Sequence, residues 1–219
     1  MRRGVLGGTF DPVHVGHLDV ARAARTAVRL DEIRVMPSRI PPHRTLPHAP
    51  AEARLAMVRL AIAGEPGLMA SDLELQSESP SYTTATLDRL QASGEDLRSV
   101  FFITGADAFR DIASWKDYPA ILDRCHFVAV SRPGCPASRL RDALPALASR
   151  MIDASDPLPP GPAIVLVDAP TAPVSSTDIR QRLAAGQSIA GLVPPAVAAY
   201  IEKHGLYRPS RVKEQNGQG

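Results

Sequence analysis

The stretch GGTFDPVHVGHL, from Gly7 to Leu18, separates two different sequence patterns. The apolar residues before it are typical of a buried strand, whereas residues 18–30 (LDVARAARTAVRL) have the periodicity of an amphipathic helix. Two histidines, His14 and His17, are therefore predicted to lie in a strand-to-helix turn. Because the first N–H groups of a helix have no partner within it, such a turn is a favourable place for an anion.

The same change of pattern recurs along the chain. Near-continuous apolar runs, typical of strands buried on both faces of a parallel sheet, occur at 4–7, 32–37, 99–105, 125–131 and 163–169. Helices are predicted at 18–30, 51–64, 83–94, 136–149, 176–186 and 194–205. This alternation predicts an α/β fold, a single Rossmann-like doubly wound parallel sheet with helices on both faces. We expect one domain at 1–207 and a polar, disordered tail at 208–219.

The composition is that of an ordinary globular protein. Of 219 residues, 44% are hydrophobic and 22% are charged. No apolar run approaches the roughly 20 residues that span a bilayer, and the N-terminus lacks a secretory signal pattern. Two cysteines, Cys125 and Cys135, do not make a disulfide framework, so we expect free thiols and a cytoplasmic protein. The net charge of +2 does not by itself indicate nucleic-acid binding.

The composition of the turn points to a phosphate ligand. Gly7 and Gly8 let the backbone approach a ligand closely, and the following helix directs its free N–H groups at the same space. The turn matches neither the P-loop nor the dinucleotide-binding glycine pattern. Two alternatives stay open for His14 and His17: zinc ligation, which lacks an evident third ligand, and a role limited to capping the helix.

The turn resembles the signature of the HxGH nucleotidylyltransferase superfamily. From Gly7 to about Tyr207 the chain resembles the bacterial nicotinate-nucleotide adenylyltransferase family, with segments in the family's order: PSRIPPHR (37–44), SYTTATL (81–87), ITGADAFRDIASW (103–115), SSTDIRQRL (175–183) and LVPPAVAAYIEKHGLY (192–207). The resemblance implies transfer of the adenylyl group of ATP to nicotinate mononucleotide, with release of pyrophosphate, in NAD biosynthesis. The attacking phosphate is already ionised at neutral pH, so such a site must position charges rather than supply a strong base.

The resemblance also implies the residues that bind ATP. His14 and His17 would donate hydrogen bonds to its phosphates and Arg180 would hold the leaving phosphates, which makes these three the predicted catalytic residues. The predicted ATP-binding residues are Gly7, Gly8, Thr9, His14, His17, Gly105, Asp107, Ser176, Thr177 and Arg180. Taken alone, SSTDIR could be a plain helix cap.

Four residues are implied for the mononucleotide: Thr9, Arg44, Thr83 and Trp115, the last by stacking on the pyridine ring. Each of the last three has a plainer alternative. Arg44 could be a solvated charge in its proline-bounded loop, SYTT could be a helix start capped by Ser81 or Thr83, and Trp115 could belong to the core. Lys116 stands where relatives often have an aromatic residue, which predicts a less enclosed ring pocket.

Magnesium is the expected cofactor, bound mainly through the phosphates of ATP, and no residue is predicted to be a metal ligand. Asp11 could be an outer-shell partner of the ion or could serve the turn before Pro12. ATP and nicotinate mononucleotide are the expected partners, with no nucleic acid and no membrane. Two other functions remain open: a nucleotidylyltransferase for another phosphate, such as nicotinamide mononucleotide or phosphopantetheine, and a nucleotide-binding module without catalysis.

Overall fold

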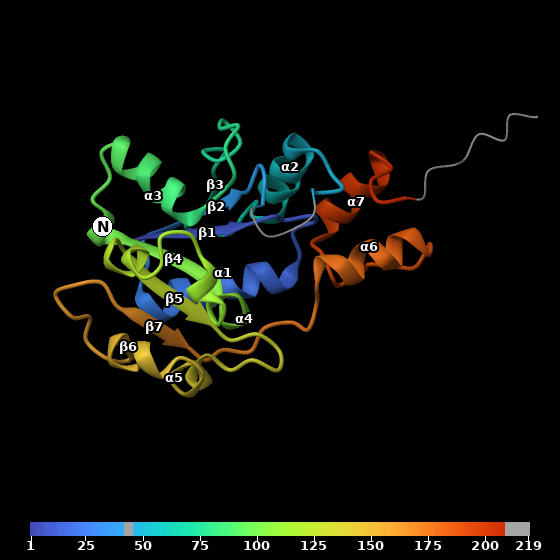
Figure 1. The fold of residues 1–219 in the computed structure, drawn as a ribbon. Coiled ribbons are helices and arrows are strands. Elements are labelled where there is room, and N and C mark those ends of the chain that lie inside the picture. The colour runs from blue at the N-terminus through green and yellow to red at the C-terminus, as the bar shows by residue number, and fades with distance from the viewer. Residues whose placement is uncertain (42–45, 209–219) are drawn as a thin grey trace, which may run out of the picture.

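The computed structural model describes residues 1–41 and 46–208. Within these residues a seven-stranded parallel sheet has the order β3-β2-β1-β4-β5-β7-β6 (Figure 1). The strands are β1 (Arg3–Gly8), β2 (Glu32–Pro37), β3 (Leu68–Ala70), β4 (Val100–Gly105), β5 (His126–Val130), β6 (Met151–Asp153) and β7 (Ile164–Val167). The parallel α/β sheet predicted from the alternation of patterns is confirmed.

Helices connect the strands and cover the sheet on both sides. They are α1 (Val15–Val28), α2 (Ala51–Ala61), α3 (Thr83–Ala92), α4 (Ala106–Phe109), α5 (Leu140–Ala143), α6 (Ser176–Ala184) and α7 (Pro195–Lys203). One buried cluster combines side chains of α1, α2 and α7 with one face of the sheet, and a second combines α3 with the other face. In the part of the chain that the structure describes, no helix is both long and apolar enough to cross a membrane.

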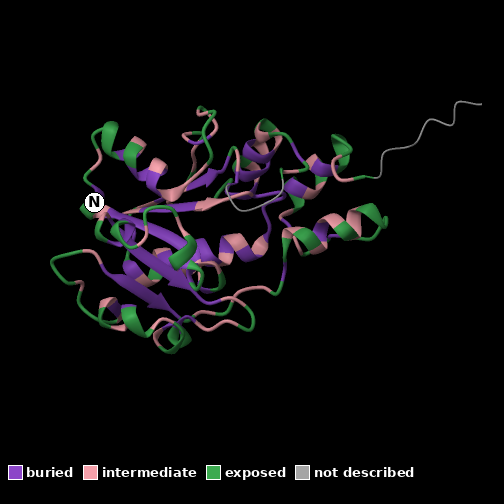
Figure 2. Ribbon diagram, viewed as in Figure 1, coloured by how far each residue is buried: buried purple, intermediate pink, exposed green. Residues whose placement is uncertain are grey.

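Each central strand contributes side chains to both clusters. In β4, Phe101 and Ile103 belong to the cluster with α1, whereas Phe102 belongs to the cluster with α3. Successive side chains of a strand point to opposite faces, so both faces of the sheet are buried. Figure 2 shows this as buried strands between helices whose outer sides are exposed. Burial on both faces explains why the strand segments are continuous apolar runs rather than alternating ones.

The structure differs from the predicted elements in three places. The edge strands β3 and β6 were not predicted, because three residues are too few to show a period. The helix predicted at 136–149 is wrong: α5 has only four residues, with 3₁₀ turns before and after it. Pro145, which lacks an N–H donor, stands at the start of the second turn and prevents one continuous helix.

The strand order places a ligand site before any side chain is considered. The chain passes from β1 to β2 and β3 at one edge, then returns beside β1 as β4 and continues towards the other edge. In open parallel sheets ligands bind beyond the carboxyl ends of the strands at such a reversal of order. Gly8 ends β1 and Gly105 ends β4 at this point, and α6 and α7 lie beyond the strand ends (Figure 1).

Candidate active site

The two histidines of the HxGH stretch lie together at the N-terminus of α1. His14 is the N-cap residue and is 2% exposed, whereas His17 is half-buried in the first turn. Their rings stack with centroids 3.7 Å apart, and the backbone N–H of His14 donates to Nδ1 of His17 at 3.2 Å. The neutral form of His17 therefore carries its proton on Nε2. The two side chains form a capping box at the start of α1, as the capping alternative expects.

His14 is held in the neutral form. Its burial, together with the positive charge of Arg132, lowers the pKa of the imidazole from 6.5 to about 3. At pH 7 the ring is thus uncharged. Burial is the larger of the two causes, so the uncharged state depends mainly on how deeply the ring is enclosed.

Arg132, which follows β5, was not among the predicted site residues. Its guanidinium donates to the carbonyls of Gly16 and Val174, both at 3.3 Å, and so joins α1 to the segment before α6. A Cβ on Gly16 would lie 3.1 Å from Nη1 of Arg132, and a Cβ on Gly105 would lie 3.0 Å from its Cγ. The two glycines therefore make room for the arginine at the carboxyl edge of the sheet. The sequence did contain a signal for it, because Arg132 directly follows the predicted strand at 125–131, at the edge of the sheet where ligands bind.

The helix α6 brings Arg180 to the first turn, from 169 residues away in the sequence. Nη1 of Arg180 donates to the backbone carbonyl of Asp11 at 2.7 Å, and Oγ of Ser176 donates to the carbonyl of Pro12 at 2.9 Å. Ser175 caps the helix by accepting from the N–H of Asp178 in the first turn. The capping alternative for SSTDIR is therefore confirmed for Ser175.

The remaining predicted ATP residues lie around the same edge. Thr9 follows β1 and is half-buried, and its carbonyl accepts from Nη1 of the buried Arg54 at 2.7 Å. Asp107 is exposed in the first turn of α4, directly after Gly105. Thr177 accepts a hydrogen bond from Nη2 of Arg180 at 3.2 Å. Arg54 was not predicted, because nothing in the pattern of α2 shows that an arginine would be buried there.

Asp11 serves the turn and does not fit a direct magnesium ligand. Oδ1 accepts from the hydroxyl of Tyr207 at 2.7 Å and from the N–H of Ala49 at 3.0 Å, and Oδ2 accepts from the N–H of His48 at 2.7 Å. Both carboxylate oxygens thus already have donors. Across residues 1–41 and 46–208, no three His, Cys, Asp or Glu side chains gather as a metal site would need. This donor set fits a metal ion carried by a ligand's phosphates rather than one held by the protein.

Two of the mononucleotide candidates, Trp115 and Thr83, lie in segments that contact each other. Trp115 is half-buried, with its ring 6.2 Å from that of Phe102, and Phe102 lies 3.4 Å from where a Cβ on Gly7 would be. Nζ of Lys116 lies 5.0 Å from the ring centroid of Tyr82, the residue before Thr83 and α3. The contacts therefore bring the segments of Trp115 and Thr83 together. Arg44 lies outside the described residues.

The plainer alternatives for these residues have different outcomes. Tyr82 is the N-cap residue of α3 and makes no side-chain capping bond, whereas Oγ of Ser81 accepts from the N–H of Arg39 at 3.0 Å. The alternative of a cap by Ser81 or Thr83 is therefore wrong. Trp115 does pack against the second core cluster, but it is not fully covered. A half-covered indole can be both part of the core and a surface for a ring to stack on.

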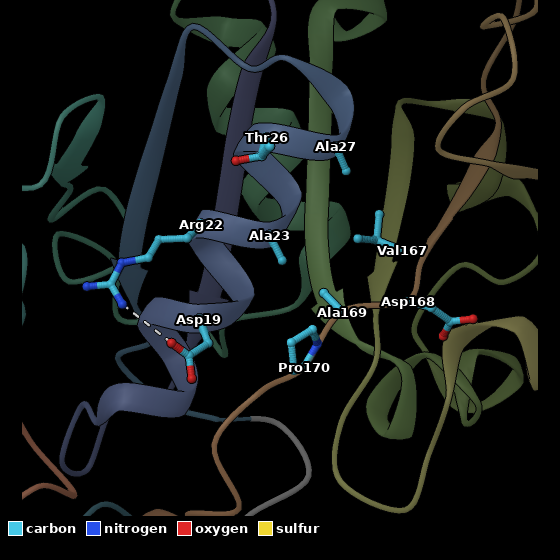
Figure 3. A pocket seen from close by; sticks show the side chains of 9 residues that line it. All are labelled: Asp19, Arg22, Ala23, Thr26, Ala27, Val167, Asp168, Ala169 and Pro170. Carbon is cyan, nitrogen blue, oxygen red and sulfur yellow. Dashed lines mark hydrogen bonds and ion pairs between the residues drawn. The ribbon is translucent and has the colours of Figure 1, made fainter.

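Two hollows adjoin the carboxyl edge of β7. One of about 300 Å³ lies beside Arg132 and is lined by Arg132, Pro133, Ala169, Pro170, Thr171 and Pro173. The other, of about 430 Å³, lies between α1 and the end of β7 (Figure 3). It contains none of the predicted site residues, and its arginine, Arg22, is paired with Asp19 and Glu65. The smaller hollow is likewise lined by none of the predicted site residues, and it adjoins the candidate site only through Arg132.

Comparison with known proteins agrees with this geometry. The cytidylyltransferase-like family model matches residues 5–182. A probable nicotinate-nucleotide adenylyltransferase of Roseiflexus sp. (strain RS-1) is 43% identical over 208 residues, covering 94% of this chain and 97% of that protein. One from Pseudomonas entomophila (strain L48) is 44% identical over 216 residues, covering 95% and 96%.

Solved structures show the same fold at lower identity. A Plasmodium falciparum nicotinic acid mononucleotide adenylyltransferase complexed with NaAD has a TM-score of 0.69 and 21% identity, covering 94% of this chain and 97% of that one. A putative nicotinate-nucleotide adenylyltransferase from Vibrio parahaemolyticus has a TM-score of 0.61 and 20% identity, covering 94% and 96%. With its fold, its paired turns and its relatives over nearly the whole length, the chain belongs to the cytidylyltransferase-like family and, within it, to the nicotinate-nucleotide adenylyltransferases.

Proposed function

We propose that the protein transfers the adenylyl group of ATP to nicotinate mononucleotide, giving nicotinate adenine dinucleotide and pyrophosphate in NAD biosynthesis. The observation that carries this proposal is the contact of Arg180 with the backbone of Asp11, three residues before His14. This contact joins α6, which carries Arg180, to the turn that leads into the two histidines. It supports a shared site in which a guanidinium and two imidazoles bind a chain of phosphates.

The chemistry requires positioning more than proton transfer. A 5′-phosphate oxygen of the mononucleotide attacks the α-phosphorus of ATP, and the bond from that phosphorus to the bridging oxygen of the β-phosphate breaks. Pyrophosphate leaves with the electrons of that bond. Because nucleophile and leaving group are both phosphate oxygens, no residue has to remove a proton, and the site gains rate by in-line orientation and by donors aimed at the developing charge.

We assign the donors as follows. His14, neutral because of its burial, and His17, with its proton on Nε2, donate to the phosphate that undergoes transfer. Arg180 uses two of its five N–H groups on Asp11 and Thr177 and keeps the others for the leaving β- and γ-phosphates. Gly7, Gly8, Gly105, Asp107 and Ser176 complete the ATP side of the proposal.

The mononucleotide lies, in this proposal, between the glycine turn and α3. Trp115 provides the surface for the pyridine ring, and Thr9 and Thr83 flank the sugar and phosphate. Nζ of Lys116, the residue after Trp115, lies 5.0 Å from the ring centroid of Tyr82, the residue before Thr83, which supports an ammonium group near the proposed ring pocket. A positive charge favours a ring that carries a carboxylate over one that carries a carboxamide, which supports nicotinate over nicotinamide as the base. Arg44 remains a proposed anion contact.

Magnesium belongs to the proposal as an ion that arrives on ATP and reduces the repulsion between phosphates and nucleophile. The engaged oxygens of Asp11 support this mode of binding. We propose a cytoplasmic location on the basis of Cys125 and Cys135, which are free thiols in the structure.

A pyrophosphate-release assay with ATP, magnesium and a panel of phosphate acceptors tests the function. We expect the highest kcat/KM with nicotinate mononucleotide, compared with nicotinamide mononucleotide and phosphopantetheine. Equal or faster turnover of the amide form would overturn the choice of substrate and leave the reaction class intact. No pyrophosphate with any acceptor, together with tight ATP binding, would instead identify a nucleotide-binding module.

A further inference from the structure

We propose that Tyr207 is a positioning residue of the triphosphate site, acting through Asp11 on Arg180. The inference rests on the proposed function, because it assumes that Arg180 binds phosphates. It assigns a role to Tyr207, which lies beyond α7 as the last residue of the segment 192–207 and was not among the predicted site residues.

Asp11 is the junction on which this role depends. Its carboxylate is 3% exposed and joins three parts of the chain: its own turn, the segment before α2 and the segment after α7 at Tyr207. Oδ1 of Asp11 accepts a hydrogen bond from the hydroxyl of Tyr207 and a second one from the backbone N–H of Ala49. A buried carboxylate that loses a donor must move or find another, because an unmet charge in the interior is costly.

The same residue holds the guanidinium. The backbone carbonyl of Asp11 accepts from Nη1 of Arg180 at 2.7 Å, and the same nitrogen lies 4.0 Å from Oδ2. A shift of the carboxylate therefore moves the residue whose carbonyl orients Arg180. Because rates and affinities at a phosphate site depend on sub-ångström placement of donors, a small shift at Asp11 is expected to be measurable at the ligand.

The backbone conformation of the segment after α7 holds Tyr207 in this contact. Tyr207 has φ = 62°, a left-handed conformation that non-glycine residues seldom adopt, and it follows Gly205 with φ = 60°. Such backbone persists only where the surroundings hold it. The phenol is a lasting donor as well: burial and the neighbouring Asp11 carboxylate both raise its pKa, so it stays protonated. Arg54 and Arg180 act in the opposite direction but do not outweigh them.

The test is a double-mutant cycle of Tyr207→Phe and Arg180→Ala, with Tyr200→Phe on α7 as the matched control. The readouts are the Kd of a non-hydrolysable ATP analogue by calorimetry, the KM of each substrate and thermal unfolding. We expect Tyr207→Phe to weaken analogue binding about tenfold and to change the KM of the acceptor less than twofold. In the Arg180→Ala background it should add no more than a twofold loss, because its effect passes through Arg180.

A folded Tyr207→Phe that binds the analogue as tightly as Tyr200→Phe would overturn the proposal. Full additivity of the losses in analogue affinity caused by Tyr207→Phe and Arg180→Ala would also overturn it, because a purely structural tyrosine would lower stability without coupling to the arginine. Should Tyr207→Phe not fold, Tyr207→His, which keeps a ring and a donor, enters the same cycle under the same criteria. The calorimetric arm contains no acceptor. Failure of the proposed substrate would therefore leave this result unaffected, and the two failures are distinguishable.

Discussion

Replacing His17 by alanine removes one hydrogen-bond donor from the proposed phosphate site, and the structure allows its two consequences to be separated. The first is on stability. The variant loses the acceptor of the His14 N–H at 3.2 Å, worth about 0.5–1.5 kcal/mol, and two ring contacts, to His14 and Phe10, each worth about 0.5–1.5 kcal/mol. A loss of about 1.5–4.5 kcal/mol is smaller than the 5–15 kcal/mol typical of domain stability, so we expect the variant to fold.

The second consequence is on turnover. Loss of one well-placed donor to a developing charge costs on the order of 10²–10³ in rate, equivalent to about 2.7–4 kcal/mol of transition-state stabilisation. We therefore expect kcat for pyrophosphate release to fall at least about 10²-fold. His17→Phe keeps an aromatic ring against Phe10 and removes the donor, so it should be as slow as His17→Ala while recovering part of the stability.

The assay is steady-state pyrophosphate release at saturating ATP and nicotinate mononucleotide, paired with thermal unfolding of each variant. His204→Ala is the matched control, because His204 is an exposed histidine after α7 that contacts Tyr200 rather than the site. Its turnover should equal that of the wild type. A folded His17→Ala that turns over within threefold of the wild type would refute the role given to this imidazole.

Three further predictions follow from buried and charged side chains. The folded-state pKa of His14, about 3, lies below its ordinary 6.5, so the unfolded chain takes up the proton first and the free energy of unfolding falls as pH drops from 6.5 towards 3. In urea unfolding, the free energy of unfolding of the wild type should fall by roughly 3 kcal/mol more between pH 7 and pH 4 than that of His14→Gln. The same pH dependence in both proteins would contradict a neutral buried ring. Arg54→Met leaves three backbone carbonyls without their donor and should lower the free energy of unfolding by on the order of 3 kcal/mol. The control Arg59→Met, on the exposed side of α2, should lower it by less than about 0.5 kcal/mol. Equal losses in the two variants would argue against the buried hydrogen-bond network of Arg54. Lys116→Met should lower kcat/KM for nicotinate mononucleotide about threefold to fivefold, as expected for the loss of an exposed ion pair between Lys116 and the ring carboxylate. The value for nicotinamide mononucleotide should not change. An equal loss with both substrates would contradict a role of the Lys116 charge in choosing the acid.

The candidate site was predictable where its signal is local. His14, His17, Gly7 and Gly8 occupy neighbouring positions in a turn between two strong patterns, so their grouping needs no tertiary information. Arg180 was assigned by resemblance, and its contact with Asp11 was not visible in the sequence. The only signal for Arg132 was its position directly after the predicted strand at 125–131. Arg54 and Tyr207 gave none, because each reaches a backbone carbonyl or a carboxylate in a distant segment.

For this protein the sequence alone determined the central strands, most of the helices and the turn that carries the histidines. These depend on the period of apolar residues and on glycine, proline and capping positions, which are properties of a few consecutive residues. Only the tertiary structure decided the edge strands, the break at Pro145 and the hydrogen bonds that Arg180 of α6 and Tyr207 donate to Asp11. The physical reason is that these features are set by which surfaces are left to cover and which buried groups need a partner once the sheet has formed.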